Sequence, residues 1–194
     1  MKKLLLGFCM LMSCLLACNS TKNTTTKADE NVLRIKPPGT LKFLANSTIY
    51  AAEATFREWE FTKLNLPTSG IKGMTATIEI HINSVYERTI RLTSDLKKED
   101  YLNGVNFPKA YVEIKNVSPL GGNKYIANMD LKIKDITKSV KSEFVLLNDA
   151  PPYKVKGEVI LNRQEFDIAK KMGKEVKDKV VVQFETELKM SEEE

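Results

Sequence analysis

The stretch from Lys124 to Leu147 alternates apolar and polar side chains, and this period of two constrains the fold more than any other feature. Successive side chains of an extended strand point to opposite faces, so the alternation predicts strands with one buried and one solvated face. A short break at Lys134–Thr137 separates the two runs, which predicts an antiparallel hairpin. Because a single hairpin is marginal in water, we expect further strands to wrap round and cover its apolar face.

Similar strand patterns recur along the rest of the chain, separated by short links. They fall at Leu41–Ile49, Ala52–Phe61, Ala76–Ile82, Tyr111–Val117, Tyr153–Leu161 and Val180–Leu188. Between them, Leu64–Lys72 contains Pro67 and Gly70 and is expected to be a loop. We expect one helical turn at Lys97–Leu102 and a basic, irregular connection at Gln164–Lys179.

This count gives about eight strands and an all-β, antiparallel fold. Closing such a sheet into a barrel removes its exposed edges. The interior of an eight-stranded barrel is either filled by side chains or holds one small or elongated ligand. We therefore predict an eight-stranded, lipocalin-like β-barrel with one short helical turn, spanning residues 32–190 as one domain.

The N-terminal residues 1–17 have the features of a lipoprotein signal peptide. Lys2 and Lys3 precede a mostly apolar run that is too short to span a bilayer comfortably. The run ends in Leu15-Leu16-Ala17-Cys18, which resembles the lipobox of bacterial lipoproteins, where the cysteine is lipid-modified, typically with palmitate. Multiple acyl chains make such attachment durable. An ordinary secretory signal with a coincidental cysteine is the alternative.

Residues 18–31 would then be the lipidated Cys18 followed by a polar tether rich in Ser, Thr, Asn and Lys, and residues 191–194 a disordered acidic tail. Cys9 and Cys14 would leave with the signal, so no thiol remains for a disulfide or a metal. Asn19, rather than aspartate, follows Cys18. This favours an outer-membrane anchor with the domain facing the periplasm.

The net charge of +5 is a mild excess, and no basic stripe is interleaved with aromatic residues. The sequence therefore does not predict a nucleic-acid-binding protein. A weak attraction to anionic lipid headgroups is compatible with this charge.

Three parts of the sequence, at Leu131–Val140, at Asn162–Ile168 and in four segments between Ile82 and Pro108, carry a resemblance to the YceI family of periplasmic polyisoprenoid-binding proteins. The most specific is Leu131–Val140, which is similar to the family's "LTIKGVTKPV" hairpin, and Asn162–Ile168 resembles its "R-x-x-F-G-I". The third combines Ile82–Val85, Leu92–Leu96, Lys98–Leu102 and Asn106–Pro108. Together they cover roughly residues 40–189. The family's Arg-Asp-x-His-Leu is replaced by Thr93-Ser94-Asp95-Leu96, and Asp135 and Asp167 replace glycines.

The resemblance implies an elongated antiparallel barrel, similar to lipocalins, that holds an isoprenoid chain or another amphiphile and catalyses nothing. It implies no cofactor other than a bound isoprenoid or fatty-acid-like lipid. The candidates to line the lumen are Phe56, Trp59, Phe61, Ile78, Ile80, Ile82, Met129, Leu131, Phe144, Leu146, Tyr153 and Phe184. A packed core without a cavity is the alternative explanation of these residues.

Basic residues near the barrel mouth are candidates to meet a lipid headgroup. They are Arg57, Arg88, Arg91, Arg163 and Lys171. Lys171 belongs to a basic run in the last long loop, together with Lys170, Lys174, Lys177 and Lys179. The alternative is that these lysines only form a solvated, charged loop and bind no headgroup.

His81 is the single histidine and shares the polar face of its strand with Glu79 and Asn83. A lone histidine without a cysteine or carboxylate cluster does not predict a metal site. Asp95, Glu99 and Asp100 could pair as acid and base, but capping or solvated roles explain them more simply. No catalytic motif occurs, so we do not expect an enzyme.

We therefore predict a lipid-anchored envelope protein that sequesters or transports a long apolar ligand. The expected partners are that lipid or isoprenoid and, through Cys18, the membrane. The sequence leaves open whether the protein also forms a homodimer. The competing hypothesis is an envelope interaction or scaffold module with a filled barrel. The packing of side chains across the barrel axis would separate the two.

Overall fold

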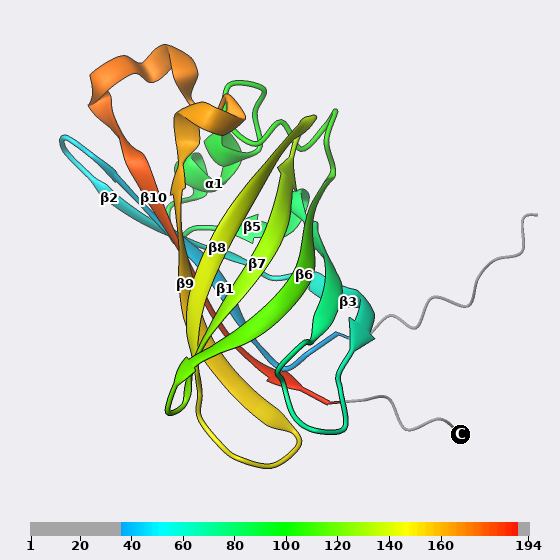
Figure 1. Ribbon diagram of the computed structural model, residues 1–194. Helices are drawn as coiled ribbons and strands as arrows, with labels where there is room; N and C mark the ends of the chain where they lie inside the picture. The colour runs from blue at the N-terminus through cyan, green and yellow to red at the C-terminus, as the bar shows by residue number, and fades with distance from the viewer. Residues whose placement is uncertain (1–35, 190–194) are drawn as a thin grey trace, which may run out of the picture. The chain divides into compact units, whose positions relative to one another are not determined.

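The computed structural model describes residues 36–189, in which ten strands form one antiparallel sheet. The strands are β1 (Gly39–Ser47), β2 (Ala51–Phe56), β3 (Trp59–Asn65), β4 (Thr75–His81), β5 (Val85–Tyr86), β6 (Lys109–Gly121), β7 (Lys124–Ile133), β8 (Ile136–Leu146), β9 (Tyr153–Asn162) and β10 (Val176–Leu188). Their order across the sheet is β3-β4-β6-β7-β8-β9-β10-β1-β2-β5. The sheet curls into a half-barrel (Figure 1), and its end strands β3 and β5 do not pair with each other, so the predicted closed barrel was wrong. We refer to the half-barrel as the barrel below.

The hairpin predicted from the alternating pattern is present as β7 and β8. It turns at Lys134 and Asp135, between the paired residues Ile133 and Ile136. Lys134 has a φ of 55°, a left-handed backbone that a tight turn requires. The all-β, antiparallel fold is thereby confirmed.

The number of strands is ten, so the expectation of eight was wrong. One predicted strand, Ala52–Phe61, is divided at Arg57 and Glu58 into β2, which pairs with β1, and β3, which pairs with β4. The inward-facing side chains are at even positions in β2, such as Phe56, and at odd positions in β3, such as Trp59 and Phe61. This change shows that β2 and β3 are not one continuous strand. β5 adds a strand of only two residues, which pairs with the end of β2.

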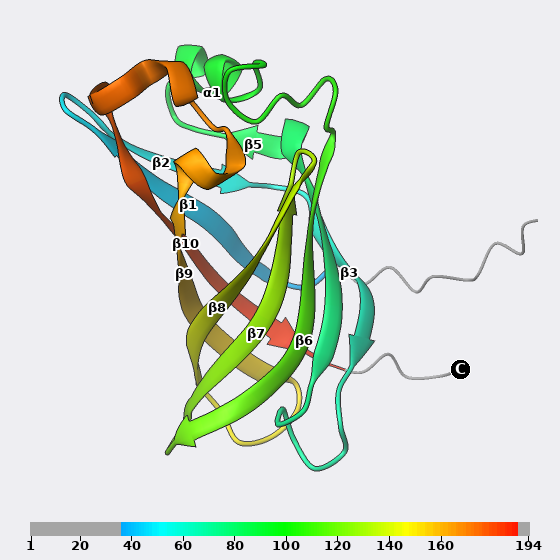
Figure 2. The ribbon, with the colours of Figure 1, turned by 45° about the horizontal axis from the view of Figure 1, so that its top comes forward.

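The contact between β8 and β9 is unusually short. The two strands share only four residue pairs, which join Glu143–Leu146 to Val155–Glu158. Beyond Glu143 and Glu158 the strands separate, while β9 stays paired with β10 through Asn162. This separation is visible between β8 and β9 in Figure 2.

The helix also lies elsewhere than predicted. The chain forms α1 at Ile90–Leu96, and the segment expected to be helical, Lys97–Leu102, is a series of turns after it. Leu92 and Leu96 are four residues apart and pack on the core, which fixes the buried face of α1. None of the helices within residues 36–189 has the length and apolar character needed to cross a bilayer.

Three short 3-10 helices complete the structure: η1 (Ile82–Ser84), η2 (Arg163–Phe166) and η3 (Lys170–Glu175). The connection predicted to be irregular at Gln164–Lys179 thus contains most of η2 and all of η3, and its last residues already belong to β10. The signal segment, Cys18, the tether and the acidic tail lie outside the described residues. Figure 2 shows α1 and the orange η2–η3 segment at the same end of the barrel.

Candidate functional site

The interior of the half-barrel holds a cavity of about 160 Å3. Every strand except β5 contributes to its wall. The lining side chains are Leu41, Phe56, Trp59, Phe61, Met74, Ile78, Ile80, Ile82, Leu102, Ala110, Val112, Ile114, Ala127, Met129, Leu131, Ile133, Val140, Ser142, Phe144, Val155, Val159, Leu161, Val182, Phe184, Thr186 and Leu188. Because these positions alternate along each strand, the period of two in the sequence becomes a continuous apolar surface.

Two of the lining residues, Ser142 and Thr186, carry a hydroxyl, and both hydroxyls have backbone partners. Ser142 Oγ donates to the carbonyl oxygen of Glu158 at 3.1 Å, and Thr186 Oγ1 donates to that of Pro38 at 3.1 Å. A hydroxyl that already donates its hydrogen to the backbone can act toward a ligand only as an acceptor. The cavity therefore offers an apolar surface and lacks lining charges.

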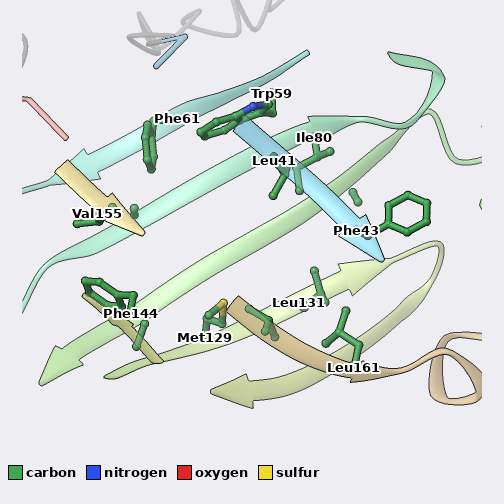
Figure 3. Close-up of a cluster of buried hydrophobic side chains, with 14 of the residues drawn as sticks. Leu41, Phe43, Trp59, Phe61, Ile80, Met129, Leu131, Phe144, Val155 and Leu161 are labelled. Carbon is green, nitrogen blue, oxygen red and sulfur yellow. The ribbon is translucent and has the colours of Figure 1, made fainter. Parts of the chain in front are cut away.

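Ten of the twelve residues predicted to line the lumen lie on the cavity wall. Figure 3 shows Trp59 and Phe61 on one side of the interior and Met129, Leu131 and Phe144 on the other. The two exceptions are Leu146 and Tyr153, which pack in the core near the cavity without lining it. Contact with a ligand is still a prediction for all twelve.

Sequence analysis missed lining residues of two kinds. Leu41, Val112 and Ile114 lie in predicted strands and share the inward parity of their neighbours, so the alternating pattern could have identified them. Met74 and Leu102 lie outside the strands, and no periodicity marks them as lining residues. Their position depends on how the loops fold back over the barrel.

Two phenylalanines share the space above Gly157 inside the barrel. Gly157 of β9 is paired with Phe144 of β8 on one side and with Phe184 of β10 on the other. The two ring centroids are 6.4 Å apart. On its other side, Phe144 stacks on Tyr125 of β7 at 5.7 Å. The glycine is therefore covered by aromatic rings from the neighbouring strands.

The size of the cavity limits what it can hold in this conformation. A cavity of roughly 150 Å3 lined by Leu, Ile and Phe is large enough for benzene. The lumen described here has nearly that volume. It accommodates a short apolar group, and a longer chain requires side chains to move.

At one end, loops and short helices close the barrel. Leu96, Leu102 and Phe166 are buried there. The amide of Ala169 donates to the carbonyl oxygen of Asp100 at 2.6 Å, which ties the η2–η3 connection to the turns after α1. We call this group of segments the cap: α1, residues 97–107 and residues 163–175.

Two lysines hold the cap in place, Lys134 from the β7–β8 turn and Lys171 between two segments of the cap itself. Lys134 Nζ donates to the carbonyl oxygen of Asp167 at 2.9 Å, and burial lowers the pKa of Lys134 despite nearby carboxylates. Lys171, a predicted headgroup residue, lies 2.9 Å from Asp100, and its hydrogen bond to that carboxylate raises the Lys171 pKa. Lys171 is nonetheless largely exposed, so a headgroup could compete for it.

The geometry of Arg163 argues against the predicted headgroup role. Its side chain is 1% exposed, and its guanidinium donates to four backbone carbonyl oxygens at 2.7–3.1 Å. These belong to Ile168, Ala169, Val176 and Lys177. Nη2 is also 3.1 Å from the Asp178 carboxylate. Arg163 therefore holds the η2–η3 connection against the start of β10.

The remaining predicted headgroup arginines are exposed. Arg57 stacks on the ring of Tyr86, with 3.6 Å between its Cζ atom and the ring centroid. Arg88 and Arg91 lie just before and within α1, and Arg91 is within 4.0 Å of Asp95. These three residues are available at the surface near the cap.

A second hollow, of about 590 Å3, lies over the middle strands and was not predicted. Lys42, Lys124 and Lys156 line it together with Glu143 and other polar residues. It also touches Gly157, Phe144 and Phe184, the residues that pair across β8, β9 and β10 on the inner face of the barrel. The two hollows thus adjoin the same part of the sheet, one apolar and one charged.

His81 is surrounded by carboxylates, contrary to the sequence-based expectation. Its Nε2 atom lies 3.2 Å from Glu79 and 3.9 Å from Glu60, and its Nδ1 atom lies 3.8 Å from Glu58. The ligand atoms of Glu60, Glu79 and His81 all lie within 4.8 Å of one another, so these three residues are the set among residues 36–189 that could hold a cation. However, Lys109 Nζ is 2.6 Å from Glu79 and already supplies positive charge. We interpret the cluster as an ion-pair network.

Comparison with known proteins identifies the fold. The profile of the YceI-like domain matches residues 39–188. No curated protein sequence matches the chain. The structure is similar to that of Burkholderia cenocepacia BcnA, with a TM-score of 0.71 and 17% identity over 78% of this chain and 96% of that chain.

Two further solved structures are similar to this one in fold. A polyisoprenoid-binding domain from Saccharophagus degradans, implicated in plant cell wall breakdown, has a TM-score of 0.60 and 11% identity over 79% of this chain and 95% of that chain. The Campylobacter jejuni YCEI protein has a TM-score of 0.58 and 14% identity over 71% and 85% of the two chains. At these identities the similarity concerns the fold.

Proposed function

Because the chain belongs to the YceI-like domain family, we propose that it binds an apolar chain, such as an isoprenoid or another amphiphilic lipid, in the lumen of its barrel. Binding removes the chain from water, and each buried CH2 group favours the complex by about 0.8 kcal/mol. The protein would sequester or carry the ligand without chemically changing it.

The observation that carries this proposal is the apolar lumen itself. Its wall is built from nine of the ten strands, and its two hydroxyls are satisfied by backbone carbonyls. Ligand sites are typically concave and mostly apolar. A structural neighbour described as a polyisoprenoid-binding domain supports the same class of ligand.

Native mass spectrometry of gently purified protein tests the proposal. We expect a co-purified lipid, or uptake of a polyprenol or fatty acid supplied to the protein. Ala127→Phe places a ring in the lumen from a buried position and should abolish uptake, whereas Ala51→Phe makes the same change at an exposed position and should not. Absence of any bound or acquired lipid in the unchanged protein contradicts the proposal.

We further propose that Cys18 carries the lipid anchor and that the domain faces the periplasm from the outer membrane. The support is the lipobox-like Leu15-Leu16-Ala17-Cys18 and the following Asn19. Metabolic labelling with a palmitate analogue, combined with Cys18→Ser, tests the anchor. The substitution should abolish labelling and release the protein from the membrane fraction, and label that persists in Cys18→Ser contradicts the assignment.

The small volume of the cavity favours one competing function. A barrel holding only about 160 Å3 of free space is close to a filled barrel, as expected for an interaction or scaffold module in the envelope. Such a module would give protein partners in crosslinking and no lipid in the mass spectrum. The two proposals therefore predict opposite results in the same lipid-uptake experiment.

A further inference from the structure

The row of paired residues Phe144, Gly157 and Phe184 is tightly packed on the inner face of the barrel. A β-carbon built on Gly157 would lie 2.5 Å from Phe144 Cβ, 2.7 Å from the Glu143 carbonyl oxygen and 2.8 Å from Phe184 Cζ. These separations are shorter than a carbon contact at optimal distance. The Phe184 ring and Phe144 Cβ therefore occupy the volume that a side chain at position 157 of β9 would fill.

The residues that line the cavity also show that the space over Gly157 is occupied. On β9, the cavity touches Val155 on one side of Gly157, and Val159 and Leu161 on the other, but it does not touch Gly157. Both phenylalanines line the cavity at this level. A chain lying along the lumen must therefore pass the two rings.

The two rings differ in how firmly they are held. Phe144 is 6% exposed and packs between Tyr125 and Phe184. Phe184 is only half-buried, although both phenylalanines border the outer charged hollow. Phe144 is thus the more tightly packed of the two rings, and Phe184 is the less buried one.

We infer that Phe144 and Phe184 set the length of the apolar chain that the lumen accepts, so that the preferred ligand is a short chain or the end segment of a longer one. This inference rests on the proposed apolar-ligand function. Its basis is the filling of the lumen above Gly157 and a free volume close to that occupied by benzene. It assigns selectivity for chain length to one pair of aromatic residues.

The test uses the full-length protein and straight-chain alcohols from hexanol to octadecanol, with bound alcohol counted by native mass spectrometry. While added carbons are buried, each should tighten binding about fourfold. The affinity should then stop rising at the length that fills the lumen. In Phe184→Leu and in Phe144→Leu, we expect this plateau to move to longer alcohols.

Phe43→Leu is the matched control, because Phe43 is buried in the same barrel and packs on Phe56 but does not line the cavity. Its plateau should stay at the length found for the unchanged protein. Phe184→Leu is the main test variant because its side chain is the less buried of the pair.

The outcomes separate the two proposals. A plateau at the same length in the unchanged protein and in Phe184→Leu overturns the selectivity inference and leaves apolar binding intact. If the affinity of the unchanged protein keeps rising up to octadecanol, the selectivity inference is likewise overturned, and apolar binding is left intact. If the unchanged protein binds none of the alcohols, both the selectivity and the proposed apolar function fail.

Discussion

Glu60 and Glu79 lie directly opposite each other on neighbouring strands β3 and β4. Like charges in this arrangement destabilise a sheet. Glu79 is only 5% exposed, but Lys109 Nζ at 2.6 Å and His81 Nε2 at 3.2 Å face its carboxylate. The stability of this corner of the barrel therefore depends on Lys109 as well as on the strand pairing.

Replacing Lys109 with methionine should destabilise the protein. We expect a loss of about 2 kcal/mol in the free energy of unfolding, below the range for fully buried pairs because the Lys109 side chain is 35% exposed. The loss should be smaller when Glu60 is replaced by glutamine, because the opposing charge is then gone. Urea unfolding of the two single variants and the double variant measures this coupling, and equal losses in both backgrounds would count against it.

Lys156→Met is the control for the loss of a lysine from an exposed ion pair. It breaks the pair with Glu185 and should change stability by less than about 1 kcal/mol.

Arg163 should be essential for the η2–η3 connection. In Arg163→Met, four backbone carbonyl oxygens lose a charged donor, and leaving such groups unsatisfied costs about 3 kcal/mol or more in total. Arg163→Lys should recover little, since one ammonium cannot match the geometry of a planar guanidinium. Thermal unfolding checks both variants against Arg91→Met, whose side chain is 91% exposed. A melting temperature for Arg163→Met equal to that of Arg91→Met would be inconsistent with this role.

The strands were predictable because their signal is local. β7, β8 and β9 each place alternate residues inward, so a period of two in the sequence marks the same residues that line the lumen. The division of the predicted strand at Arg57 and Glu58 also left a local mark. Phe56 and Trp59 both line the cavity although they are three residues apart, and such a shift of parity is incompatible with one regular strand.

Other features depend on the register between distant segments. The cluster around His81 exists because β3 places Glu60 opposite Glu79, and no pattern within either strand specifies that pairing. The position of α1 was locally marked by the spacing of Leu92 and Leu96, which sequence analysis did not use. The buried role of Arg163, by contrast, requires the backbone carbonyls of two separate segments to converge, which only the folded chain shows.

Tyr50 should make stability depend on pH through Glu87. The Tyr50 hydroxyl donates to Glu87 Oε1 at 2.7 Å, and the Thr89 amide donates to the other carboxylate oxygen. These hydrogen bonds, the one from Tyr50 first, lower the pKa of Glu87. A carboxyl whose pKa is lower when folded stabilises the protein above its unfolded pKa, and this contribution is lost as the pH falls through the folded pKa.

We therefore expect Tyr50→Phe to be less stable than the unchanged protein at neutral pH. The difference should shrink as the pH is lowered below the ordinary range of a glutamate pKa. Urea unfolding across this pH range measures the difference. In a Glu87→Gln background, which cannot titrate, the effect of Tyr50→Phe should no longer vary with pH. A difference that keeps its size at acid pH in the Glu87 protein would assign the Tyr50 contribution to something other than ionised Glu87.

Gly157→Ala should destabilise the barrel because the space above the glycine is already filled. The added methyl group meets Phe144 Cβ, the Glu143 carbonyl oxygen and the Phe184 ring, and overpacking of this kind costs about 1–3 kcal/mol. Phe184→Leu should relieve part of this loss, because it removes the ring contact and leaves the two contacts on β8. Chemical unfolding of the single and double variants measures the recovery. Lys156→Ala on the outer face is the control, and its free energy of unfolding should stay within about 0.5 kcal/mol of that of the unchanged protein. If Gly157→Ala is as stable as that control, the rings do not fill the space above β9, and the basis for length selection in the lumen is removed.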